Sequence, residues 1–198
     1  MSKEKYPVTP AIRFLREHHI AYEPHVFAYE EHGGTAQTAA ELGLDEHQVI
    51  KTIVLANEEK HGLIVLMHGD REISTRNLAR QLGMKHIEPA TAAQASKWTG
   101  YLFGGTSPFG TKTALPVYVE ASIYALERLC INGGKRGFQV IISPQDLAVL
   151  NPQTVNVAGE SASTPIYIHL SARSVCKPDN LRANLAAKRL PFPWTGLG

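Results

Sequence analysis

A lysine interrupts an otherwise apolar segment, VIKTIVLA, at residues 49–56. Alternate side chains of a β-strand lie on opposite faces, so Lys51 shares one face with Ile53, whereas Thr52 lies on the other. Both faces are largely apolar, which is typical of a strand covered on both sides. A lysine there must reach solvent, bind an anion or bear a large desolvation cost. Its ammonium group could bind a phosphate or a ribose-linked oxygen, or its stem could simply snorkel from the strand end.

Two glycine-rich segments offer further binding chemistry. The segment GGTSPFG at residues 104–110 presents backbone N–H groups that a ligand can approach closely, because glycine has no side chain, and Pro108 stiffens the segment. Such amides can hold a carbonyl oxygen or stabilise an oxyanion, although an ordinary hairpin turn has the same composition. The segment NGGKRG at residues 132–137 is either a turn with two solvated cations or an RNA phosphate contact made by Lys135 and Arg136.

Other catalytic chemistries lack their motifs. The nine histidines form neither HExxH nor a Cys/His zinc pattern, so we predict no metal site. No GxSxG segment is present, and Ser107 is followed by proline, which disfavours a serine hydrolase. Both cysteines lie outside the glycine-rich segments, and neither a Walker A motif nor a Rossmann fingerprint occurs.

These candidate residues need a scaffold of short strands and helices. Strands are expected at residues 21–29, 49–56, 62–68, 86–89, 115–120, 128–131 and 138–143. Helices are expected after the capping residues Thr9, Thr35, Ser74, Thr91 and Ser143. The mixture predicts an α+β or mixed α/β fold.

Composition and charge narrow the class of protein. The 198 residues have a formal net charge of +2, so the chain is no polybasic nucleic-acid coat. Cys130 and Cys176 show no disulfide framework, which indicates a reducing compartment. The first residues lack the apolar core of a signal peptide, and no apolar run is long enough to span a bilayer, so we expect a soluble, cytoplasmic protein.

A change of composition near Val157 predicts a domain boundary. We expect one domain over residues 1–157 and a C-terminal extension over residues 158–198, which is rich in small polar residues, proline and glycine. A short strand at 165–170 and a helix near 178–188 are expected within the extension. Packing or disorder is its simpler interpretation, and contact with a partner is the alternative.

Four segments occur in an order that is more specific than any of them alone: TPAIRFL, VIKTIVL, WTGYLFGGTSPFG and INGGKRGFQVIISPQDL. Together they resemble the YbaK/EbsC family of bacterial Cys-tRNA(Pro) deacylases, which is related to the editing domain of bacterial prolyl-tRNA synthetases. The resemblance runs from about Thr9 to Val157. It implies a single compact domain with a curved, barrel-like mixed β-sheet surrounded by helices. It also implies hydrolysis of a mischarged aminoacyl ester on tRNA, without a metal or organic cofactor.

The resemblance also implies roles for particular residues. Lys51 matches the essential lysine of the family, which engages the terminal nucleotide of the tRNA. The matching GxxxP loop, whose amides position the aminoacyl group, consists of Gly104, Gly105, Thr106, Ser107 and Pro108.

The chain departs from the family pattern at three positions of the expected substrate site. Phe27 aligns with a tyrosine common in cysteine-editing relatives, Gln139 aligns with an acidic residue, and Thr106 replaces a more usual aliphatic residue. These differences alter the polarity of the expected substrate site and leave Lys51 and the glycine frame of the loop unchanged.

Three functions therefore remain open. The resemblance favours a freestanding deacylase of mischarged Cys-tRNA(Pro), in which the substrate thiol attacks its own ester carbonyl. A deacylase for another small amino acid, such as alanine on tRNA(Pro), would use a positioned water instead. The third function is a non-catalytic module that binds tRNA or a synthetase. Prolyl-tRNA synthetase is an expected partner, because it would supply tRNA selectivity.

Overall fold

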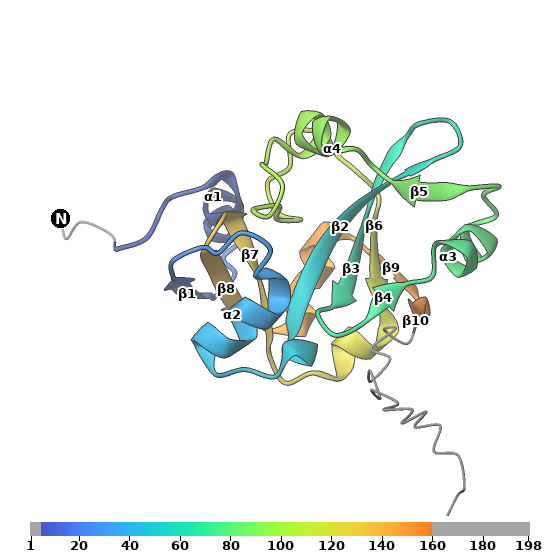
Figure 1. Cartoon of the computed structure of the whole chain (residues 1–198). Helices are drawn as coiled ribbons and strands as arrows, with labels where there is room; N and C mark the ends of the chain where they lie inside the picture. The colour runs from blue at the N-terminus through green and yellow to red at the C-terminus, as the bar shows by residue number, and fades with distance from the viewer. Residues whose placement is uncertain (1–4, 160–198) are drawn as a thin grey trace, which may run out of the picture. The chain divides into compact units, whose positions relative to one another are not determined.

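A mixed β-sheet of eight strands forms the centre of the fold in the computed structural model, which describes residues 5–159 (Figure 1). The strand order is β1-β8-β7-β2-β3-β6-β9, and β5 also pairs with β2. The strands are β1 (Glu23–Val26), β2 (Val49–Asn57), β3 (Gly62–His68), β5 (Ile87–Pro89), β6 (Val117–Glu120), β7 (Leu129–Lys135), β8 (Phe138–Ile142) and β9 (Gln153–Val155). The end strands β1 and β9 do not pair with each other, so the sheet is not closed.

Four α-helices and three short 3₁₀ helices surround the strands. They are α1 (Pro10–Glu17), α2 (Gly34–Leu42), α3 (Thr75–Leu82), α4 (Ala92–Thr99), η1 (Glu46–Gln48), η2 (Ala121–Ala125) and η3 (Pro144–Leu150). The described residues belong to one compact unit, which confirms the predicted single domain of mixed α/β class for this part of the chain. Among the helices that the structure describes, none is both long and apolar enough to cross a membrane.

Three of the predicted helix starts are confirmed by their capping bonds. The side chains of Thr9, Ser74 and Thr91 each accept a hydrogen bond from the backbone N–H three residues ahead. Each bond satisfies one of the donors that a helix start leaves without a partner within the helix.

The prediction that Thr35 caps α2 is wrong. The helix begins at Gly34 with Gly33 as its cap, and Thr35 instead donates to Oε1 of Glu46 at 2.6 Å. The segment after Ser143 forms the 3₁₀ helix η3, and the Ser143 side chain makes no capping bond.

Strand β2 is covered on both faces, as its sequence predicts. Ile50 and Val54 pack into one apolar cluster, whereas Leu55 and Ile53 pack into a second. Alternation along β2 separates the two clusters, because successive side chains point to opposite faces.

One edge of β2 is paired only at its two ends. Strand β3 pairs with the other edge of β2 along Ile50–Ala56. Strands β7 and β5 therefore share the edge opposite β3. Strand β7 pairs in parallel with residues 49–50, and β5 pairs with residues 55–57. No described strand pairs with residues 51–54 along this edge, which leaves a gap in the sheet beside the predicted Lys51 site.

The chain after Val157 continues the described fold for two residues. Strand β10 (Ala158–Gly159) pairs with β4 (Glu72–Ile73) in a separate two-stranded sheet. The strand and the helix expected at 165–170 and 178–188 lie outside the described residues.

Candidate functional site

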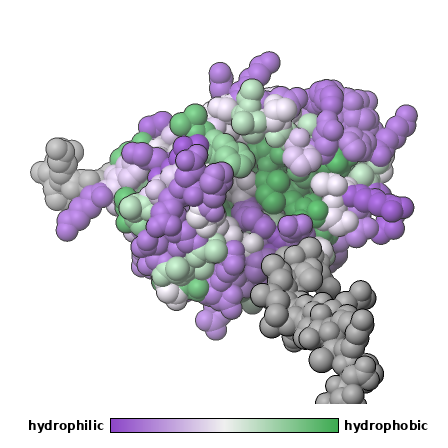
Figure 2. Space-filling model, viewed as in Figure 1, coloured by the Kyte–Doolittle hydropathy of each residue, from purple (hydrophilic) through white to green (hydrophobic). Residues whose placement is uncertain are grey.

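A cavity of about 500 Å³ lies at the open edge of β2. Its walls come from the segment before α2, from α2 itself, from β2, from the start of α4, and from the two glycine-rich segments. Apolar residues gather near the middle of the face seen in Figure 2, with polar residues around them. The volume is within the range of about 300–1,000 Å³ that is usual for small-molecule sites.

The cavity includes residues from both faces of β2. Lys51 and Thr52 point to opposite sides of the strand, yet both line the cavity. This is possible because the cavity lies against the strand edge that neither β7 nor β5 covers.

The Lys51 ammonium group is partly buried and held by the backbone. Its Nζ atom donates a hydrogen bond to the carbonyl oxygen of Arg71, in the turn between β3 and β4. Desolvation lowers the pKa of Lys51, although the carboxylates of Glu72, Glu46 and Asp70 act in the opposite direction. The structure therefore places a desolvated cation on the cavity wall, where a ligand oxygen could replace or join the Arg71 carbonyl.

The GxxxP loop contributes only part of its length to the cavity wall. Gly104, which has φ +82°, and Thr106 line the cavity. Gly105, Ser107 and Pro108 are buried behind the wall, and Ser107 Oγ accepts a hydrogen bond from the Phe109 N–H at 3.4 Å. The buried residues of the loop thus support the two residues that line the cavity.

Backbone contacts join the two glycine-rich segments. A Cβ atom at Gly105 would lie 2.8 Å from the backbone nitrogen of Arg136, so only glycine allows this approach. Asn132 donates from Nδ2 to the Gly104 carbonyl at 3.3 Å, and its Oδ1 accepts from the N–H groups of Gly134 and Lys135 at 2.7 and 3.2 Å. The two segments therefore form one wall.

The Arg136 side chain completes this wall, whereas Lys135 contributes only backbone to it and does not line the cavity. The Nε atom of Arg136 donates to the Phe103 carbonyl at 2.8 Å, and its guanidinium lies 5.2 Å from the centre of the Tyr29 ring. Lys135 is exposed and lies in β7, at a β-bulge that begins at Asn132. Residues 132–135 of the segment predicted as a turn thus continue the strand, and Arg136 and Gly137 form the turn to β8.

Phe27 and Gln139 both line the cavity. The Phe27 N–H donates to the Gly137 carbonyl at 2.9 Å, which extends the pairing of β1 with β8. Gln139 is buried and donates from Nε2 to Thr38 Oγ1 at 3.5 Å. The cavity thus brings together six of the predicted site residues: Phe27, Lys51, Gly104, Thr106, Arg136 and Gln139.

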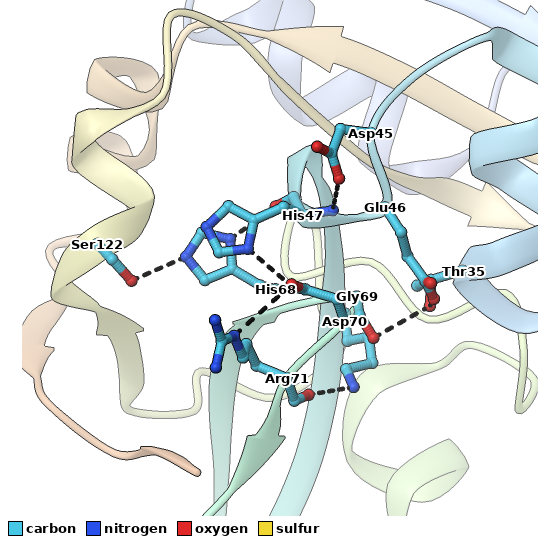
Figure 3. A network of polar contacts seen from close by, with 10 residues as sticks. Thr35, Asp45, Glu46, His47, His68, Gly69, Asp70, Arg71 and Ser122 are labelled. Carbon is cyan, nitrogen blue, oxygen red and sulfur yellow. Dashed lines mark hydrogen bonds and ion pairs between the residues drawn. The ribbon is translucent and has the colours of Figure 1, made fainter. Parts of the chain in front are cut away.

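A histidine cluster lies beside the turn that holds Lys51 (Figure 3). His47 Nδ1 contacts Asp70 Oδ1 at 2.8 Å, and the two ring nitrogens of His68 contact the His47 carbonyl at 2.6 Å and Ser122 Oγ at 2.8 Å. Burial lowers the pKa of His68, so its ring is neutral near pH 7. A neutral ring that donates from Nδ1 to the carbonyl accepts the Ser122 hydroxyl at Nε2.

The same cluster is poorly arranged for a metal ion. The candidate ligand atoms of His47, His68 and Asp70 lie within 4.8 Å of one another. However, the two rings stack with centroids 3.6 Å apart and planes 9° apart. A metal about 2.0–2.1 Å from each nitrogen would lie in both ring planes, which stacked rings do not allow. We interpret the cluster as an anchor of the β3–β4 turn.

Sequence reasoning missed two groups in this site. The Arg71 carbonyl carries no signal in the sequence, because any residue supplies a backbone oxygen. Asn132 does carry one, since an asparagine before two glycines often binds backbone groups two residues ahead.

Comparison with known proteins identifies the family. A family model described as the aminoacyl-tRNA editing domain matches residues 30–150. The chain belongs to this family. The resemblance stated from the sequence and the predicted enzyme class, an aminoacyl-tRNA deacylase, are thereby confirmed.

Relatives agree with this assignment. EbsC of Enterococcus faecalis, named for deacylation of Cys-tRNA(Pro) and Cys-tRNA(Cys), is 29% identical over 152 residues, which are 76% of this chain and 93% of EbsC. A proline–tRNA ligase of Thermodesulfovibrio yellowstonii is 30% identical over 112 residues, 57% of this chain and 18% of the ligase. A crystal structure described as a trans-editing enzyme for prolyl tRNA synthetase has a TM-score of 0.65 at 20% identity, over 77% of this chain and 99% of its own, which shows the shared fold.

Proposed function

We propose that this chain removes a small amino acid from mischarged tRNA(Pro), with cysteine as the leading substrate. The observation that carries the proposal is one cavity at which Lys51 and Gly104 meet, in a chain of the aminoacyl-tRNA editing family. We assign Lys51 to the terminal nucleotide and the Gly104 and Thr106 backbone to the aminoacyl group. The likeness to EbsC supports cysteine, because EbsC is named for Cys-tRNA deacylation.

The side chains around the cavity favour a reaction without a protein nucleophile. Among the described residues that line it there is neither a serine nor a cysteine, and none of its threonine hydroxyls is hydrogen-bonded to a histidine that could activate it. Cys130 is fully buried in β7, and burial raises its pKa to about 12, so it is no thiolate at neutral pH. In the proposed reaction the substrate thiol attacks its own ester carbonyl. The new C–S bond replaces the C–O bond to the tRNA, whose hydroxyl takes up the thiol proton.

The protein would accelerate this step by positioning and by electrostatics. Holding the thiol near the carbonyl makes the attack intramolecular. The backbone N–H groups of Gly104 and Thr106 would stabilise the oxygen on which negative charge develops, while Lys51 would hold the terminal nucleotide in place. We further propose that the chain works in the cytoplasm beside prolyl-tRNA synthetase, which would raise its effective concentration near charged tRNA.

Amino acid release from purified Cys-tRNA(Pro) and Ala-tRNA(Pro) tests this function. Wild type is compared with Lys51→Ala, with Lys51→Met, which keeps most of the aliphatic stem, and with Lys60→Ala at an exposed lysine in the β2–β3 turn as control. We expect fast release of cysteine by wild type and the control, and loss of release in both Lys51 variants while unfolding stays cooperative. Release of alanine alone would assign a water nucleophile. If wild type releases neither amino acid, the chain is a binding module.

A further inference from the structure

An exposed aromatic side chain stands at the entrance to the cavity. Phe103 and Leu102, adjacent in the chain, are 74% and 70% exposed and directly precede Gly104. Phe103 lines the cavity, whereas Leu102 does not. Leaving so much aromatic surface in water forgoes the free energy that its burial would supply. An exposed ring at the rim of a site is therefore a candidate contact for a ligand.

The backbone that carries Phe103 is fixed, although its ring is free. The Phe103 carbonyl accepts from Arg136 Nε at 2.8 Å, and the Gly104 carbonyl accepts from Asn132 Nδ2 at 3.3 Å. A ring on a held backbone loses little conformational freedom when a ligand covers it, so binding retains more of the contact energy.

A cationic side chain contacts the Phe103 backbone. The Arg136 guanidinium packs over Tyr29, and within residues 5–159 its two terminal nitrogens make no hydrogen bond. Lys135 is exposed next to it, and Lys51 lies deeper on the cavity wall. Exposed aromatic rings combined with cations are how proteins bind single-stranded nucleic acid, since bases stack on the rings and phosphates pair with the cations.

We propose that Phe103 is a stacking platform for an unpaired base at the 3′ end of the tRNA, with Arg136 contacting an adjacent phosphate. The inference rests on the proposed function, because an aminoacyl group in the cavity would place the 3′-terminal nucleotides at its entrance. The cavity suits one aminoacyl-nucleoside by volume, about 500 Å³, so the preceding base lies outside, where Phe103 stands. Phe103 thereby contributes affinity for the preceding nucleotide, whereas Lys51 holds the terminal nucleotide.

The test measures binding of deacylated tRNA(Pro) with 2-aminopurine in place of an adenine or cytosine at its unpaired 3′ end. Fluorescence quenching reports stacking, and anisotropy reports affinity. We expect Phe103→Ala to raise Kd by about 5- to 150-fold and to abolish quenching, since base stacking contributes about 1–3 kcal/mol. Phe103→Trp should restore both signals. Leu102→Ala, equally exposed and next in the chain, should change Kd by less than about twofold, within the usual effect of a surface substitution.

Each alternative result has a defined meaning. Unchanged Kd in Phe103→Ala, or no binding by wild type, overturns the proposal. Equal losses of tRNA affinity in Phe103→Ala and Leu102→Ala overturn it as well. A loss of affinity that is seen only when prolyl-tRNA synthetase is added would also overturn it, and would assign both residues to a protein interface. Because the RNA is deacylated, normal quenching without turnover would contradict the proposed function and leave the platform standing.

Discussion

Gly105→Ala should separate the two glycine-rich segments and thereby open the cavity wall. The new Cβ would lie 2.8 Å from the backbone nitrogen of Arg136 and 3.0 Å from the carbonyl carbon of Lys135. Both neighbours are backbone atoms, so the loop must move as a whole. Overpacking of this kind costs about 1–3 kcal/mol. Movement also breaks the bonds from Arg136 to Phe103 and from Asn132 to Gly104, which contribute about 1 kcal/mol each.

We therefore expect Gly105→Ala to lower the free energy of unfolding by about 3–5 kcal/mol, the sum of these effects, and to reduce deacylation more than tenfold at a temperature where it is still folded. Urea unfolding and amino acid release measure the two effects. Gly83→Ala is the control, because Gly83 has φ +67° with open space around its Cβ and lies at the end of α3. Left-handed strain alone costs about 1–2 kcal/mol there, with activity retained. If both variants lose equal stability and Gly105→Ala keeps its activity, the close approach does not support the wall.

Three further predictions concern ionisable groups. Asp70→Ala removes the carboxylate that accepts from His47. Unfolding in urea should therefore show a loss of about 1–2 kcal/mol, and deacylation should also fall because the turn that holds Lys51 loosens. Burial lowers the pKa of His68 below 6.5, so the unfolded state binds a proton more readily than the folded state. The free energy of unfolding should therefore decrease as the pH falls below about 6.5. His68→Gln removes the titrating group and should flatten this decrease. In a Cys176→Ser variant, Cys130 is the one remaining cysteine. It should not react with a thiol reagent at pH 8 until urea unfolds the chain, because burial raises its pKa to about 12. Rapid reaction of the native protein would contradict the burial of Cys130.

Local features of the sequence were sufficient to predict much of the fold. Thr9, Ser74 and Thr91 precede their helices as predicted, because a capping bond depends on residues only three positions apart. The burial of β2 on both faces follows from apolar residues at successive positions. Thr35 failed as a cap because a partner distant from its own helix start, Glu46, takes its hydroxyl. Competition of that kind is invisible to a local pattern.

The sequence likewise predicted some features of the candidate site and not others. The sequence by itself determined which chemistry was available: one lysine in a buried strand, two glycine-rich segments, and the family that this combination resembles. It could not show that Gly105 supports the wall while Gly104 lines it, since that depends on how closely Arg136 approaches.

Only the tertiary structure decided how these parts meet. Alternation places Lys51 and Thr52 on opposite faces, yet they share one cavity because β7 and β5 leave the edge of β2 open between them. The pairing of β2 with β7 joins residues about eighty positions apart, and the Lys51 ammonium is held by a carbonyl from another turn. Such contacts depend on long-range strand order and backbone geometry, which no local spacing of side chains encodes.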